Sequence, residues 1–144
     1  YFYISINTKF LMKKFIILFL ILTSSCSPPS VCPELFFDSV NIITYDSNNK
    51  LFTGRCSTYE NDTIRSVRQY LNGKDYGRWT FYYPNGNKET TGKFNNTGDR
   101  IGKWKYYYVN GKIKQLSTFS NNGEIKGRWV TYDSIGNVTS DISY

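Results

Sequence analysis

The stretch Gly77-Arg78-Trp79-Thr80-Phe81-Tyr82 returns twice along the chain, as Gly102-Lys103-Trp104-Lys105-Tyr106-Tyr107 and as Gly127-Arg128-Trp129-Val130-Thr131-Tyr132. The step from Trp79 to Trp104 equals the step from Trp104 to Trp129. The glycines of the turn that follows each copy keep the same step, at Gly86, Gly111 and Gly136. A fixed step of about 25 residues is typical of repeat architectures, in which one unit cannot bury its apolar face alone.

A degenerate copy, Gly54-Arg55-Cys56-Ser57-Thr58-Tyr59, lies slightly less than one step upstream, with Cys56 where tryptophan is expected. It lacks the Asn-Gly turn and has Glu60-Asn61-Asp62 instead, which favours a capping role for this first unit. The predicted units lie near residues 54–76, 77–101, 102–126 and 127–144.

Side-chain alternation within each copy predicts β-strands. Trp79, Phe81 and Tyr83 would point to one side and Thr80 and Tyr82 to the other, as period 2 requires. The Asn-Gly pairs that end two of these strands predict type I′ hairpin turns, and a more polar return strand follows each of them. No stretch has the pattern of a convincing helix.

Successive hairpins would pair edge to edge, so the sequence predicts an all-β fold. The expected architecture is an antiparallel meander of repeated β-hairpins in an elongated, mostly single-layer sheet. Matching positions would lie two strands apart, at roughly 9 to 10 Å. One face would then carry the tryptophan row and the other a tyrosine row of Tyr59, Tyr82, Tyr107 and Tyr132. The residues that define the repeat are Gly77, Trp79, Gly86, Gly102, Trp104, Gly111, Gly127, Trp129 and Gly136.

The pattern Gly-x-Trp-x-x-Tyr-Tyr-x-Asn-Gly, with a polar return strand and an aromatic before the next unit, resembles the MORN-repeat variant family. The resemblance extends over about 51–138 and is clearest over 77–132. It implies an elongated β-sheet used as an interaction scaffold, which says little about function by itself. Many bacterial members carry the label "antitoxin of a toxin–antitoxin system", so the resemblance also implies an antitoxin role.

Residues 1–25 are interpreted as upstream sequence followed by a signal peptide that starts at Met12. A short basic region precedes an apolar run of eight residues, Phe15 to Leu22, which is too short for a membrane span of about 20 residues. Small residues directly before Cys26 resemble the bacterial lipoprotein signal, in which that cysteine is acylated. Thr23 stands where leucine is usual. An ordinary cleaved signal and a buried N-terminal strand are the alternatives.

A proline-rich stretch, 26–34, is predicted to be an extended tether, because three prolines in six positions exclude helix and interior strand. The repeat domain would follow at 35–144, opening with a lead-in strand over 35–45. A disulfide between Cys32 and Cys56 would tie the tether to the first unit, since an oxidising compartment favours pairing. Alternatively, Cys56 replaces a tryptophan in the core and Cys32 is free.

The formal net charge is +7. Lys9, Lys13 and Lys14, which precede Cys26 without any acid, supply +3 of it, and the remainder is +4. The other basic residues are scattered singly along the sequence. This mild excess is consistent with attraction to an anionic surface but argues against a nucleic-acid partner.

Residue types that carry chemistry are scarce. The chain has no histidine, and its acids form no metal-loop or nucleophile pattern. We therefore expect no catalysis, no metal and no cofactor.

Three functions compete. The first is a lipid-anchored protein of the bacterial cell envelope whose repeats offer an interaction surface to a protein partner. The second is a module that binds glycans or lipid head groups through the tyrosine row. The third is the antitoxin role, against which the predicted signal argues when the antitoxin is cytoplasmic. For the tyrosines, cross-strand packing is the alternative to binding, although a thin sheet cannot bury both of its faces.

Overall fold

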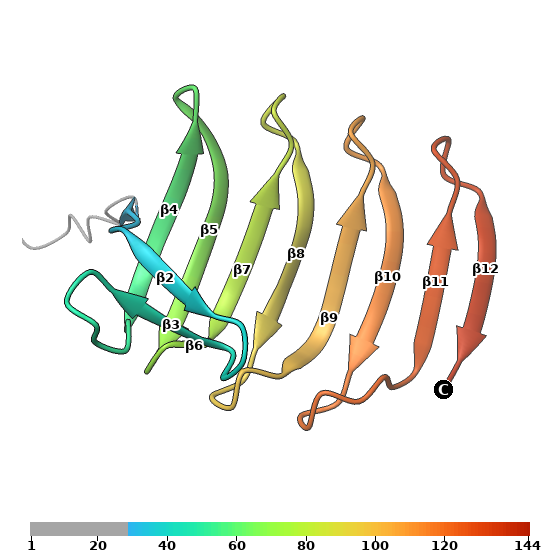
Figure 1. The fold of residues 1–144 in the computed structure, drawn as a ribbon. Helices are drawn as coiled ribbons and strands as arrows, with labels where there is room; N and C mark the ends of the chain where they lie inside the picture. Colours follow the sequence, from blue (N-terminus) through green and yellow to red (C-terminus); the bar gives the residue numbers. More distant parts are fainter. Residues whose placement is uncertain (1–28) are drawn as a thin grey trace, which may run out of the picture.

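The computed structural model describes residues 29–144. The predicted signal peptide, Cys26 and the start of the predicted tether lie outside these residues. The described chain forms one ten-stranded sheet and one two-stranded sheet, without a helix in the described part (Figure 1). The predicted all-β meander is confirmed.

The meander runs through eight strands in chain order, and each neighbouring pair is antiparallel. The first two units contain β4 (Gly54–Glu60), β5 (Thr63–Leu71), β7 (Gly77–Tyr82) and β8 (Lys88–Phe94). The last two contain β9 (Arg100–Tyr107), β10 (Ile113–Phe119), β11 (Arg128–Tyr132) and β12 (Val138–Ser143). The short β6 (Lys74–Asp75) pairs with β5 beside this path.

The predicted type I′ turns at Asn85-Gly86 and Asn110-Gly111 are wrong. Only the glycine of each pair has a positive φ, 83° in both cases. The amide of Gly86 donates to the carbonyl of Tyr83, whose own amide donates to the carbonyl of Asn87. This is a three-residue loop, a type I turn closed by a glycine in the left-handed region. Pro84 favours it, because its ring holds φ negative at the first turn position.

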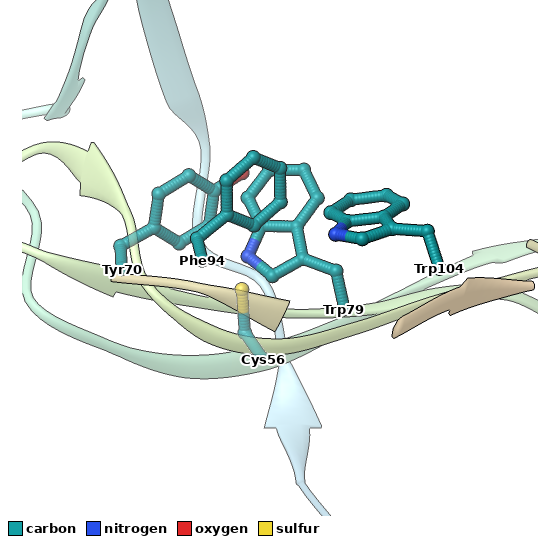
Figure 2. Close-up of a cluster of buried hydrophobic side chains, with 5 residues drawn as sticks. All are labelled: Cys56, Tyr70, Trp79, Phe94 and Trp104. Atoms are coloured by element: carbon teal, nitrogen blue, oxygen red, sulfur yellow. The ribbon is translucent and has the colours of Figure 1, made fainter. Parts of the chain in front are cut away.

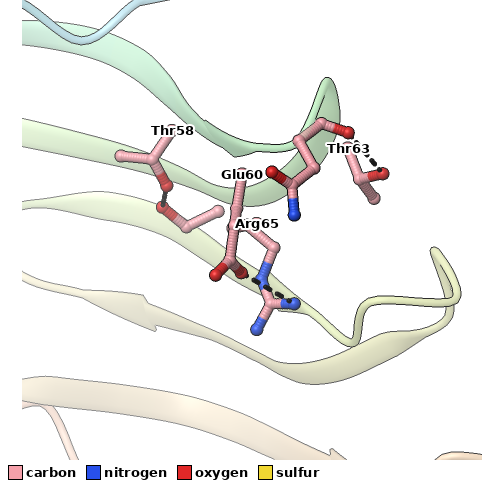
Figure 3. A network of polar contacts seen from close by, with 6 residues as sticks. Thr58, Glu60, Thr63 and Arg65 are labelled. Atoms are coloured by element: carbon pink, nitrogen blue, oxygen red, sulfur yellow. Dashed lines mark hydrogen bonds and ion pairs between the residues drawn. The ribbon is translucent and has the colours of Figure 1, made fainter.

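Type I′ geometry occurs instead in the first unit, which lacks the Asn-Gly pair and has Glu60-Asn61-Asp62 in its place. Asn61 and Asp62 have φ of 48° and 58° between the paired residues Glu60 and Thr63. An ion pair of 3.4 Å between Arg65 and Glu60 lies beside this turn (Figure 3). A second two-residue turn, Asn72-Gly73, joins β5 to β6 and was not predicted.

The predicted lead-in strand over 35–45 is in fact two strands, β2 (Leu35–Asp38) and β3 (Ile43–Asp46), paired as a separate hairpin. The carboxylate of Asp38 accepts hydrogen bonds from the amides of Val40 and Asn41, which reverses the chain between them. This hairpin lies across the strands at the N-terminal end of the large sheet (Figure 1). The single layer is therefore doubled at that end.

The described part of the predicted tether is attached to the sheet. Residues Ser30–Val31 form β1, which pairs in parallel with Cys56 and Ser57 of β4. A disulfide joins Cys32 to Cys56. The chain is thus fixed to the first unit within six residues of Cys26.

One face of the large sheet, here called the aromatic face, carries the core. Its buried cluster is Cys56, Tyr70, Trp79, Phe94 and Trp104 (Figure 2). Neighbouring rings meet edge to face, with centroids 5.3 Å apart for Tyr70 and Trp79, 5.1 Å for Trp79 and Phe94, and 5.0 Å for Phe94 and Trp104. Such contacts stabilise the fold beyond the area they bury.

Candidate binding face

The opposite face of the large sheet carries a periodic row of cations. In all four units the residue after the first glycine is basic: Arg55, Arg78, Lys103 and Arg128. Because side chains alternate along a strand, each of these points away from the core residue that follows it. They stand on β4, β7, β9 and β11, which are two strands apart, so successive members are roughly 10 Å from one another. We call this side the basic face.

A shallow, open groove follows the basic face across the first three units. Six cationic side chains line it, together with threonines, two tyrosines and one glycine, and no carboxylate does. The lining residues are Arg55, Arg78, Thr80, Tyr82, Lys88, Thr91, Gly92, Lys93, Lys103, Lys105 and Tyr107.

A second groove continues towards the C-terminal end and shares two lysines with the first. Its floor is apolar, supplied by aliphatic side chains of β10 and β11. It is lined by Lys103, Lys105, Ile113, Leu116, Ser117, Thr118, Arg128, Val130 and Tyr132. The two grooves therefore form one surface that changes from cationic to apolar.

The charge of the first groove is not neutralised from within the described chain. Ion pairs among residues 29–144 are limited to Arg65 with Glu60 and Arg128 with Asp141. Hydrogen bonds from Arg128 lower the pKa of Asp141. Both oxygens of that carboxylate accept from Arg128, so Asp141 does not neutralise the first groove. All six cations of the first groove are exposed, and none of them belongs to either pair.

The structure brings together three of the four predicted surface tyrosines. Tyr82 and Tyr107 line the first groove and Tyr132 lines the second, each half-buried. Tyr59, 47% exposed, instead lines a separate pocket beside Cys32. A register shift precedes Tyr59 just as it precedes Tyr82 and Tyr132, so Tyr59 differs from the row by lying beside residues 31–33 of the N-terminal segment.

Other tyrosines connect successive units. The hydroxyl of Tyr83 donates to the carbonyl of Tyr107 at 2.8 Å, and that of Tyr108 donates to the carbonyl of Tyr132 at 2.7 Å. Side chains of the turns also bond to the next unit: the side-chain amide of Asn85 donates to the carbonyl of Val109 at 3.0 Å. These bonds hold neighbouring hairpins in a fixed relation.

The most perturbed carboxyl lies outside both grooves. Burial raises the pKa of Asp75 to about 6, although the charges of Arg68 and Arg100 oppose the shift. Within residues 29–144, no group of three or more histidine, cysteine, aspartate or glutamate residues is placed to hold a metal ion. The same residues include no helix long and apolar enough to cross a membrane.

Sequence reasoning missed the basic face. The lysines and arginines are scattered singly along the sequence, and distances along the chain do not show which strands become neighbours. A signal was nevertheless present: the position between glycine and tryptophan is Arg or Lys in every copy, including the degenerate one at Arg55.

Comparison with known families gives one match. Residues 75–96 and 100–121 match the model of the MORN repeat variant family. These segments contain the β7–β8 and β9–β10 hairpins, start at matching places in successive units, and together make up less than a third of the chain. Searches of curated proteins and of solved structures found no match. The match concerns the repeat unit, and the site has to be interpreted from its own chemistry.

Proposed function

We propose that this protein is a non-enzymatic, lipid-anchored scaffold of the bacterial cell envelope whose basic face docks a protein partner. One observation carries the docking proposal: the aromatic face of the sheet is packed, and the charged and aromatic side chains of the basic face remain accessible. The aromatic face is packed, whereas the basic face exposes unpaired cations and half-buried tyrosines over an open surface. Unbalanced charge and contiguous exposed ring surface are features of interaction sites.

The repeat architecture supports this proposal. Hydrogen bonds from Tyr83 and Asn85 join the second unit to the third, and one from Tyr108 joins the third to the fourth, so the strands that carry this part of the basic face are held at a regular spacing before any partner arrives. A surface ordered in advance loses less conformational entropy on binding.

Truncation of a central tyrosine tests the docking proposal. Tyr107 contributes its carbonyl to the inter-unit bond, which an alanine retains, and its ring is half-buried in the first groove. We expect Tyr107→Ala to weaken capture of the partner from envelope extract and to leave the urea midpoint nearly unchanged. The matched control is Tyr144→Ala, which truncates a 63% exposed tyrosine in contact with Trp129 on the other face.

The opposing result is a loss of stability rather than of binding. If Tyr107 belongs to the core, its truncation should cost about 3 to 5 kcal/mol, as large aromatic truncations in cores do. Any fall in capture would then follow from unfolding, and the docking role of Tyr107 would be refuted. The midpoint and the captured fraction are measured on the same preparation.

The anchor part of the proposal rests on the Thr23-Ser24-Ser25-Cys26 sequence. The disulfide fixes Cys32 to the sheet, and six residues span at most about 20 Å. An acylated Cys26 would thus hold the sheet close to the membrane surface. We expect Cys26→Ser to abolish both incorporation of labelled fatty acid and partition with membranes, and labelling that persists in the variant would contradict the anchor.

A further inference from the structure

We infer that the segment held on the basic face is an extended, acidic stretch of polypeptide that also carries apolar side chains. This inference rests on the proposed docking function and names the chemistry of the partner. Three features of the described residues support it: the sign of the charge, the apolar floor beside it, and the spacing of the cations.

The charge of the first groove requires an anionic occupant. Six cations line it without a carboxylate, and none has an ion-pair partner among the described residues. Complementary potentials fix the register of a partner and speed its association, while like charges exclude wrong partners. Glutamate and aspartate side chains carry the opposite charge, and the exposed lysine side chains are long enough to contact them.

The adjoining groove requires apolar groups on the same occupant. On its floor, Ile113 and Leu116 are half-buried and Val130 is buried. The cations at its edges are the shared Lys103 and Lys105 on β9 and Arg128 on β11. A polymer that offers only charge would leave this floor in water. A polypeptide with both acidic and apolar side chains covers both parts, as the buried centre and polar rim of protein interfaces do.

The spacing of the cations matches an extended chain that crosses the strands. Arg55, Arg78 and Lys103 are successive members of the row, roughly 10 Å apart. In a polyproline II chain, an extended form with three residues per turn, every third side chain returns to the same side, and three residues cover about the same length at about 3.1 Å each. An acidic residue at every third position would therefore meet one cation of the row after another.

The test uses a fluorescein-labelled peptide of five Glu-Leu-Ser repeats and a control in which every glutamate is glutamine. The full chain is titrated into each peptide, and fluorescence anisotropy gives the affinity at low and at physiological salt. Two charge-reversal variants are compared. K103E with K105E changes both shared lysines of the grooves, whereas K50E with K126E makes the same change of charge at exposed lysines outside them.

We expect the acidic peptide to bind the wild type, and added salt to weaken this binding as it screens exposed charges. Affinity should fall by about tenfold or more in K103E with K105E, which corresponds to about 1.4 kcal/mol. It should change by less than about twofold in the control pair, because screening weakens interactions beyond a Debye length. The neutral pair K103Q with K105Q should lie between, and circular dichroism confirms that each variant is folded.

Equal binding of the acidic and the glutamine peptide would overturn the inference. The inference would also fail if K103E with K105E weakened binding to heparin or to phosphatidylglycerol vesicles but left binding of the acidic peptide unchanged. Heparin represents a polysaccharide partner and the vesicles represent a membrane.

Capture from envelope extract separates the two proposals. If Tyr107→Ala weakens capture and K103E with K105E does not, docking stands and the acidic chemistry fails; if neither variant weakens capture, the docking face fails as well.

Discussion

Gly92 lies on β8, between the strands that carry the core tryptophans Trp79 and Trp104. It pairs with Trp79 across β7 and β8, and the ring of Trp104 on β9 rests on its other side. A Cβ atom at this position would overlap the Cδ2, Cε2 and Cε3 atoms of Trp104. The missing side chain thus allows the indole of Trp104 to lie against the backbone, where only 2% of the residue remains exposed.

We therefore expect Gly92→Ala to destabilise the protein, by about 1 to 3 kcal/mol or more, as overpacked cores do. Ser117 occupies the matching place in the next unit, where it pairs with Trp104 and already has a Cβ atom. Ser117→Ala is the control, and it should cost about 1 kcal/mol for the hydrogen bond it loses from Gln115. Urea unfolding of both variants measures the difference, and a smaller cost at Gly92 would refute the close-contact explanation.

At the scale of the elements, strands were more predictable than the turns between them. Alternation of apolar and polar side chains is a property of a few consecutive residues, and it located every strand from β4 to β12 except the two-residue β6. Turn type depends in addition on how the flanking strands are registered. An Asn-Gly pair gives a two-residue turn at Asn72-Gly73 but the end of a three-residue loop at Asn85-Gly86.

The N-terminal elements show the same limit. Two short apolar patches over 35–45 indicated one lead-in strand, but Asp38 closes a turn between them, and the two patches form a hairpin. Leu35 then packs against the core cluster. The packing of this hairpin against core residues that lie further along the chain cannot be read from the local pattern of apolar and polar residues.

At the scale of the molecule, the hairpins form a linear stack in which central units have packing partners on both sides. Trp104 has ring contacts with Phe94 and Phe119, at 5.0 and 6.4 Å. Trp129, in the last unit, is half-buried and its ring contact is with Tyr144 at 6.5 Å. In repeat proteins, stability is close to a sum of unit and nearest-neighbour terms.

Trp104→Ala should consequently cost more than Trp129→Ala. For the fully buried indole we expect about 3 to 5 kcal/mol, and for Trp129 a clearly smaller loss, because less of its surface leaves water. Denaturant unfolding of the two variants under the same conditions checks this, with circular dichroism to confirm that each starts from a folded state. Equal losses would argue against a linear stack.

The sequence alone determined the repeat, the hairpins and the all-β class, because a constant repeat step and period 2 are visible in the order of the residues. It also showed which cysteines were available to pair. Only the tertiary structure decided that Arg55, Arg78, Lys93, Lys103 and Lys105 share one groove, and that Gly92 receives the ring of Trp104. The reason is strand register, which brings residues from distant parts of the chain onto neighbouring strands and depends on every turn and bulge between them.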